Sequence, residues 1–262
     1  MSKPRLSSTV LLLRDGPGLQ VLMVKRHYEI DFAAGALVFP GGKAVEDDHD
    51  ERWSDHCDGD HIGAERAARI SAVREAFEET GVVMARAKRN RGAGAPLVGS
   101  DVVDALAPHR SAVDRGEESF LALVEAHGLV LALDALVHFG HWITPDIMPK
   151  RFDTHFYIAI APDEQTARHD GRETTDAVWL GPQEALDMEA AGDATIIFPT
   201  RMNLGKLAQA KTAKTAIDTF SAQPVVTVLP SVEKTEQGEP CLRIPKEAGY
   251  IQTIELLERV KV

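Results

Sequence analysis

Three carboxylates crowded into one apolar segment restrict this chain more than any other feature of its sequence. Residues 73–83 read VREAFEETGVV and place Glu75, Glu78 and Glu79 among apolar side chains. On a helix, side chains three and four positions apart share a face, so these carboxylates would repel one another. The opposite face is apolar enough to pack the helix against a core; its residues are Val73, Ala76, Phe77 and Thr80.

A divalent cation would relieve this crowding. Magnesium prefers oxygen ligands and commonly keeps phosphate oxygens of a substrate in its shell. A helix with carboxylates at positions i, i+3 and i+4 would be a rigid clamp for one or more such ions. The alternative is an ordinary solvated helix face on which Arg74 pairs with Glu78. A second feature is the segment FPGG, residues 39–42, whose glycines allow a sharp turn and an exposed carbonyl oxygen.

Composition indicates a folded protein and excludes some partners. The 262 residues are 44% hydrophobic and 26% charged, as in globular proteins. A formal charge of -11 would repel nucleic acid. No apolar run reaches the length of a membrane span, and no secretory signal is evident, so we expect a cytoplasmic protein without membrane partners. Cys57 and Cys241 are expected to be reduced thiols.

The pattern of elements predicts an α/β protein with a mixed sheet, because strands and helices interleave. Residues 7–13 and 19–26 read as a hairpin, residues 35–39 as a third strand, and residues 62–85 as a helix with Asp60 as its cap. Residues 46–60 read either as a solvated loop or as part of a site. Further strands are expected at 138–144, 152–160, 177–180, 225–229 and 241–244, and further helices within 101–128, 182–190 and 202–220.

The combination of Gly-Gly with REAFEETGV resembles the Nudix box, G-x5-E-x7-R-E-U-x-E-E-x-G-U, in which U is a bulky apolar residue. Two departures stand out. Ala76 is smaller than the usual U, and Asp48 stands where the first Glu is expected. Asp48 and Arg74 are 26 positions apart (74 minus 48), where the box has 8, so 18 residues are inserted.

The insertion resembles a Nudix subgroup that includes the peroxisomal acyl-coenzyme A diphosphatase of mammals. The segments that carry this likeness span residues 32–53, 141–159 and 198–208. The resemblance implies a Nudix-type α/β/α sandwich with a mixed sheet and a helical C-terminal extension. We expect a Nudix domain at 1–195, with the insertion at 46–60 and a helical segment at 101–128, and an extension at 196–262 packed on the same domain. The insertion is expected to be a mobile or partner-contacting flap beside the site.

The resemblance also implies the reaction and its residues. The substrate would be a nucleoside diphosphate linked to another group, cut at the pyrophosphate with the help of Mg²⁺ or Mn²⁺. The metal would be held by Glu75, Glu78, Glu79 and the main-chain oxygen of Gly41. Arg74 would hold a glutamate in place, and Asp48 would stand in for the first glutamate of the box. The general base would be a box glutamate, Glu78 or Glu79, or the loop residue Glu173.

The resemblance leaves several nucleotide-derived substrates as alternatives. We favour coenzyme A or acyl-coenzyme A. The alternatives are ADP-ribose, a dinucleoside polyphosphate or a nucleotide sugar, or a Nudix domain that binds a nucleotide without catalysis. Residues 194–217 contain four basic residues and no acidic one, and could hold the 3'-phosphate of coenzyme A; a solvated helix face or a homodimer contact is the alternative. The expected substrate-binding residues are Arg26, Phe39, Lys43, Arg151, Arg201 and Lys206. His141 and His155 are expected to be core or surface histidines.

Overall fold

A mixed β-sheet runs through the centre of the molecule. The structure, a computed structural model, describes residues 3–27, 35–172 and 174–260. The sheet's strands are β1 (Arg5–Asp15), β2 (Leu19–Arg26), β3 (Leu37–Val38), β4 (Gly41–Lys43), β7 (Val137–Ile143), β8 (Phe152–Ile160), β9 (Thr174–Leu180) and β10 (Thr227–Val228). Their order is β10-β7-β8-β1-β2-β3, with β4 paired to β1 and β9 to β2. Because β8 is parallel and β2 antiparallel to β1, the sheet is mixed, as predicted.

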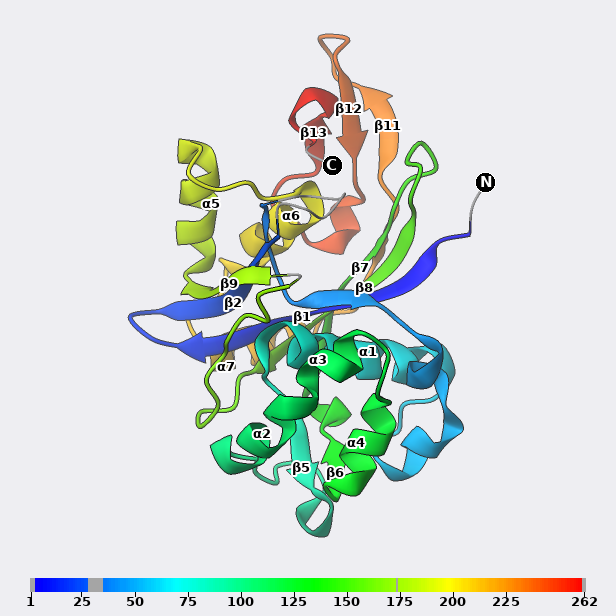
Figure 1. The fold of residues 1–262 in the computed structure, drawn as a ribbon. Helices are drawn as coiled ribbons and strands as arrows, with labels where there is room; N and C mark the ends of the chain where they lie inside the picture. Colours follow the sequence, from blue (N-terminus) through cyan, green and yellow to red (C-terminus); the bar gives the residue numbers. More distant parts are fainter. Residues whose placement is uncertain (1–2, 28–34, 173, 261–262) are drawn as a thin grey trace.

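Helices cover both faces of this sheet (Figure 1). One layer consists of α1 (Gly63–Thr80), α2 (Ser100–Leu106), α3 (Arg110–Asp114) and α4 (Phe120–Ala126); the other consists of α5 (Pro182–Ala191), α6 (Phe198–Leu207) and α7 (Ala213–Ser221). Strand β1 shows why two cores form. Val10 and Leu12 pack in the core under α1, which we call the first core, whereas Leu11 and Leu13 pack in the second core with α5, α6 and α7.

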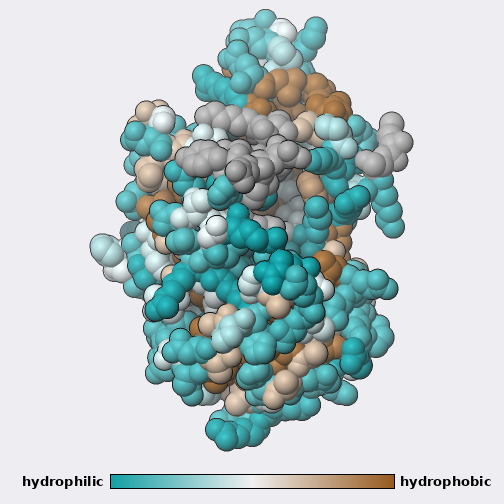
Figure 2. Space-filling view, viewed as in Figure 1, coloured by the Kyte–Doolittle hydropathy of each residue, from teal (hydrophilic) through white to brown (hydrophobic). Residues whose placement is uncertain are grey.

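Smaller elements complete the chain. Strands β5 (Ala85–Ala87) and β6 (Leu129–Leu131) pair with each other, and β11 (Ser231–Lys234), β12 (Pro240–Arg243) and β13 (Ile254–Leu256) form a separate antiparallel sheet. Figure 2 shows a largely hydrophilic face, with a hydrophobic area over this small sheet, where Val232 and Ile251 are exposed. Short 3-10 helices lie at Glu46–His49, Glu51–Asp55, Lys88–Asn90, Ala107–His109, Leu133–Ala135, Lys246–Ala248 and Leu257–Arg259.

Two predicted helices have different bounds in the structure. Helix α1 ends at Thr80, not near residue 85, because Gly81 adopts a left-handed conformation with φ of 75° and caps the helix. Its N-cap is Ile62, without a side-chain cap, so Asp60 does not have the predicted role. The helical segment predicted at 202–220 is two helices, α6 and α7. Thr212 separates them and caps α7 by accepting a hydrogen bond from the amide of Thr215.

The insertion is part of the core, so the predicted flap is wrong. Two 3-10 helices span Glu46–His49 and Glu51–Asp55. Trp53 is fully buried in the first core, and its ring lies 5.9 Å from that of Phe120. Asp48 is also fully buried. These buried aromatic and charged side chains anchor the segment to the first core.

The C-terminal residues complete the fold begun by the preceding ones. Strand β10 pairs in parallel with β7, and the second core contains Phe198, Leu204 and Phe220 beside Leu11 and other residues of the sheet. In the part of the chain that the structure describes, no helix is long and apolar enough to cross a membrane.

Candidate active site

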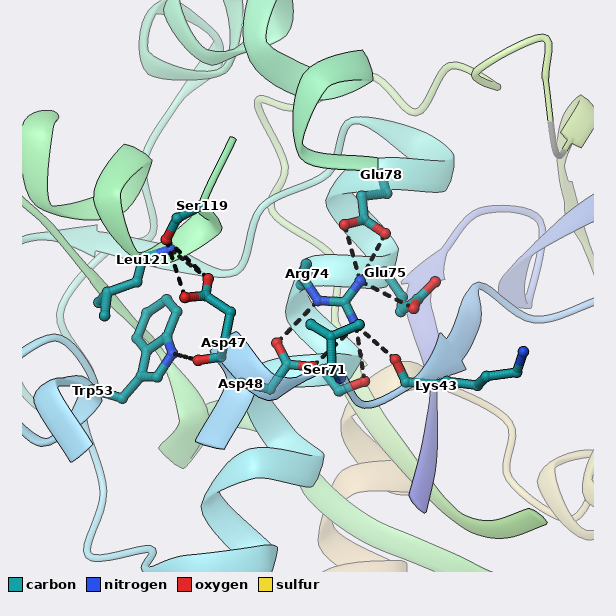
Figure 3. Close-up of polar contacts among 11 residues, drawn as sticks. Lys43, Asp47, Asp48, Trp53, Ser71, Arg74, Glu75, Glu78, Ser119 and Leu121 are labelled. Atoms are coloured by element: carbon teal, nitrogen blue, oxygen red, sulfur yellow. Dashed lines mark hydrogen bonds and ion pairs between the residues drawn. The ribbon is translucent and has the colours of Figure 1, made fainter. Parts of the chain in front are cut away.

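Arg74 is the centre of a buried polar cluster on α1 (Figure 3). Its Nε and Nη2 donate to the two carboxylate oxygens of Asp48 at 2.9 and 3.0 Å. Its Nη1 donates to both oxygens of Glu78, at 2.9 and 2.8 Å, and lies 3.1 Å from a carboxylate oxygen of Glu75. Nη2 also donates to the main-chain oxygen of Lys43 at 2.8 Å. One guanidinium therefore joins the insertion, the helix and β4.

The two glycines of β4 allow close approaches, Gly42 to α1 and Gly41 to β1. A Cβ at Gly42 would overlap the carboxylate of Glu75, and a Cβ at Gly41 would overlap the main-chain oxygen of Ser8 on β1. The amide of Gly41 donates to Oε2 of Glu79 at 3.0 Å. A side chain at Gly41 would collide with the main chain of β1, and a side chain at Gly42 would displace the carboxylate of Glu75.

The electrostatics of the cluster favour a cation. Three carboxylates, those of Asp48, Glu75 and Glu78, surround the guanidinium of Arg74, and a fourth, that of Glu79, accepts from the amide of Gly41. Burial raises the pKa of Glu75 and of Glu78 above the usual range, and the charge of Arg74 opposes that rise. Burial lowers the pKa of Arg74, but the surrounding carboxylates raise it more, so it stays charged. Hard carboxylate oxygens in excess over positive charge are the donor set that Mg²⁺ and Mn²⁺ prefer.

Arg74 also keeps these carboxylates apart. Within the described ranges, no three of them offer oxygens that all lie within 4.8 Å of one another. Figure 3 shows the guanidinium between Asp48, Glu75 and Glu78, while Glu79 is turned to the amide of Gly41. Three of these carboxylates could hold one cation only after their side chains had rotated toward one another.

The insertion supports the site from the side. Besides its pair with Arg74, Asp48 accepts a hydrogen bond from the amide of Val45 at 2.9 Å. The neighbouring Asp47 accepts from the hydroxyl of Ser119 at 2.9 Å, and its main-chain oxygen accepts from the indole of Trp53 at 2.9 Å. Asp48 thus has the supporting position expected for it, whereas no sequence pattern had indicated Ser119.

A second group of contacts fixes the C-terminal end of α1. Arg110 on α3 donates through Nε to the main-chain oxygen of Glu78 at 2.7 Å. The hydroxyl of Thr174 donates to the main-chain oxygen of Glu79 at 3.3 Å. The amide of Arg168 donates to the main-chain oxygen of Thr80 at 2.8 Å. Glu173 lies outside the described residues. No sequence motif marked Arg110, whose partner is a carbonyl 32 residues away.

Two of the four basic residues of the C-terminal segment, Lys206 and Arg201, are held by contacts within the protein. Lys206 is only 5% exposed, and its Nζ donates to the main-chain oxygen of Phe139 at 2.9 Å in the second core, on the face of the sheet opposite α1. Arg201 pairs with the buried Glu255 at 2.5 Å. Phe39 is 3% exposed and packs in the same second core. Burial therefore removes Lys206 and Phe39 from contact with a substrate at α1, and Arg201 is engaged by Glu255.

The other predicted substrate-binding residues have different surroundings. Lys43 is exposed on β4, next to the cluster. Arg26 ends β2, and its Nε is buried and has no hydrogen-bond partner among the described residues. Arg151 is tied within the loop between β7 and β8, where it donates to the main-chain oxygen of Thr144 at 2.9 Å and pairs with Asp146 at 2.7 Å.

Comparison with known proteins places this site in a family. A sequence model described as the NUDT19 Nudix domain matches residues 54–207, more than half of the chain. The acyl-coenzyme A diphosphatases NUDT19 of Xenopus laevis and Homo sapiens are each 27% identical over 207 residues. The match covers 64% of this chain and 54% of the Xenopus protein, and 65% of this chain and 55% of the human one. The chain thus spans about half the length of these curated relatives.

A solved structure agrees with this result. The crystal structure of a NUDIX hydrolase from Alicyclobacillus acidocaldarius is 26% identical, has a TM-score of 0.72, and covers 86% of this chain and 100% of its own. Its likeness covers far more of the chain than the box alone. On the family match and this shared fold, the chain belongs to the Nudix hydrolases, in the family of NUDT19 Nudix domains.

Proposed function

We propose that this protein hydrolyses the pyrophosphate bond of a nucleoside diphosphate linked to another group, with Mg²⁺ or Mn²⁺ as cofactor. The observation that carries the proposal is the placement of Glu75 and Glu79 against Gly42 and Gly41, while Arg74 joins Glu78 to Asp48. Glu75, Glu78, Glu79 and the main-chain oxygen of Gly41 would hold the metal. When bound, the ion would neutralise the pyrophosphate and make phosphorus more open to attack.

The chain's own groups would orient the reaction. Arg74 holds Glu78 through two hydrogen bonds, and Arg110 fixes the main chain at the same residue. A carboxylate must take the proton of the attacking water. Glu79, held by the amide of Gly41, is one candidate. Glu173 is the other; the loop before it is attached to the end of α1 through Arg168.

For the substrate we propose coenzyme A or an acyl-coenzyme A, cleaved to 3',5'-ADP and a phosphopantetheine. This choice of substrate is supported by the relatives from Xenopus laevis and Homo sapiens, which are named acyl-coenzyme A diphosphatases. The basic segment 194–217 no longer supports this choice, because Lys206 and Arg201 are occupied elsewhere. Lys43, exposed beside the cluster, is the residue we assign to a substrate phosphate. Cytoplasmic location and a homodimer stay predictions.

A substrate panel tests this proposal. Catalytic efficiency is measured with Mg²⁺ on coenzyme A, dephospho-coenzyme A, ADP-ribose and a dinucleoside polyphosphate, for the parent and for Lys43→Ala. Lys88→Ala, which removes an exposed lysine of a distant 3-10 helix, is the matched control. We expect coenzyme A to be the best substrate, with a higher Michaelis constant in Lys43→Ala only. Preference for ADP-ribose would overturn the coenzyme A assignment. Binding without turnover of any nucleotide would overturn the activity itself.

A further inference from the structure

A second cluster of ligand-type side chains lies on β7 and β8, apart from the carboxylates of α1. His141 and His155 are directly opposite each other in the antiparallel pair, and Asp153 lies two residues before His155 on the same face. One ligand atom from each of the three lies within 4.8 Å of the others. Their side chains are 17%, 22% and 36% exposed, so an ion could reach them from solvent.

An irregularity in β7 adds a third histidine to this face. Alternation along a strand would point His138 and His141 to opposite faces. The register shifts between His138 and Gly140, so His138 pairs with Tyr157 while His141 pairs with His155. Bulges of this kind re-aim side chains and are frequent beside functional sites. The result is three imidazoles and one carboxylate in one place.

The hydrogen bonds around the cluster are those that metal-binding histidines require. The Nδ1 atom of His141 lies 2.8 Å from the hydroxyl of Thr227, and the Nδ1 atom of His155 lies 3.1 Å from Nε2 of His138. Each ring is thus oriented through Nδ1. Each presents Nε2 to Oδ1 of Asp153, at 2.5 Å from His141 and 3.9 Å from His155. A ligand histidine typically has its other ring nitrogen bound in this way, which fixes the ring's orientation.

We propose that His141, His155 and Asp153 form a site for a divalent transition metal of the zinc class, with His138 and Thr227 as its outer partners. Two imidazoles and a carboxylate suit Zn²⁺ or Fe²⁺, whereas Mg²⁺ prefers oxygen alone. Zinc ligands at about 2.0–2.2 Å lie roughly 3.4 Å apart in a tetrahedron, so modest side-chain rotations would close the site.

The site would be distinct from the hydrolytic one. His155 is paired with Ser8 of β1, and Ser8 is paired with Gly42 of β4. Two strand spacings separate the main chains of His155 and Gly42, about 10 Å. The donor types also differ, since the α1 cluster contains carboxylates and no imidazole. An ion on β7 and β8 would join these two strands to the edge strand β10 through Thr227 and stabilise that edge.

Zinc titration of the metal-stripped full chain tests this proposal. Affinity is measured by competition with a chromophoric zinc indicator in excess Mg²⁺, which occupies the carboxylate cluster. We expect one equivalent of zinc to bind to the parent, a loss of binding in His155→Ala and Asp153→Asn, and no change in His49→Ala, an exposed histidine of the insertion. Parallel titration with Fe²⁺ without oxygen identifies the preferred ion. Absence of zinc binding, or binding that survives both substitutions, would overturn the site.

Two further measurements distinguish loss of the metal site from loss of folding in these variants. Thr227→Val removes only the outer hydroxyl from an exposed position and should weaken zinc binding by roughly 10- to 100-fold. Co²⁺ added to the parent should give the visible spectrum of a nitrogen-ligated ion, lost in His155→Ala. Full zinc affinity in Thr227→Val together with an oxygen-only Co²⁺ spectrum would contradict the proposal. Glu79→Gln should bind zinc as the parent does, whether or not it hydrolyses a nucleotide.

Discussion

At the scale of single residues, Arg74 illustrates how one side chain holds a site together. It joins Asp48 of the insertion to Glu78 of α1 and to the main-chain oxygen of Lys43 on β4. The sequence predicted its contact with a glutamate and the supporting position of Asp48. The sequence could not predict the contact of Arg110 with α1. The acceptor is the main-chain carbonyl of Glu78, and no pattern of side chains indicates a contact with a carbonyl.

Replacing Arg74 should destabilise the protein strongly. Arg74→Met would leave the fully buried Asp48 and the nearly buried Glu78 without their cation. Loss of one partner of a buried pair typically costs about 3–5 kcal/mol, because the remaining charge is uncompensated. Urea unfolding measures the change. Arg52→Met, which removes an exposed pair with Asp50, is the control and should change stability little. Equal stabilities of the two variants would show that Arg74 has no structural role.

Lys206 should make stability depend on pH. Burial lowers its pKa from 10.5 to about 8. Below about pH 8 both the folded and unfolded states carry the proton, and the cost of burying the charge is fully present. As the pH rises toward 10.5, the folded state loses the proton first, so the free energy of unfolding rises, by as much as ~3 kcal/mol. Lys206→Met should lack this rise. Urea unfolding of both proteins at about pH 7 and about pH 10 tests the sign; parallel curves would contradict it.

At the scale of elements, sequence patterns located most strands and helices but not their ends or environments. The end of α1 depended on Gly81 adopting a left-handed conformation, which a periodic pattern cannot distinguish from a continuing helix. The insertion was misjudged because its residues show no apolar period. Its 3-10 helices are instead fixed by the ring of Trp53, which packs on Phe120, and by two carboxylates that contact distant segments.

The insertion should therefore contribute to stability. Trp53→Ala removes a fully buried indole from the first core, and such truncations typically cost about 3–5 kcal/mol. Thermal and urea unfolding measure the loss. Val45→Ala, at an exposed position of the same region, is the control and should unfold like the parent. An unchanged melting temperature in Trp53→Ala, with an altered Michaelis constant, would restore the flap interpretation.

At the scale of the whole molecule, the sheet has two cores, and the C-terminal residues supply much of the second. From the sequence we expected the extension 196–262 to pack on the Nudix domain, but we interpreted the basic residues of 194–217 as an anion-binding surface patch. A list of charges does not show which face a helix buries. Lys206 lies among Phe139, Phe220 and Tyr250, where its stem packs and its ammonium meets ring faces and a carbonyl.

Removal of residues 196–262 should expose the second face of the sheet. The truncated chain would lose α6 and α7, leave Leu11 and Leu13 uncovered, and fail to unfold cooperatively. Differential scanning calorimetry measures cooperativity. Shortening the exposed hairpin turn at residues 235–239 is the control and should leave the transition nearly unchanged. A cooperative transition of 1–195 at the parent's melting temperature would show that the segment is an independent addition.

The central claim is that the carboxylates of α1 carry out metal-dependent hydrolysis. The most direct measurement is the Mg²⁺-dependent turnover of Glu79→Gln beside Glu65→Gln, a control on the first turn of the same helix. Glutamine can still accept the hydrogen bond from Gly41, so the fold should be retained. Turnover of Glu79→Gln should fall by at least about 100-fold at an unchanged melting temperature, while Glu65→Gln stays active. Parent-like turnover in Glu79→Gln on every substrate tested would contradict the account.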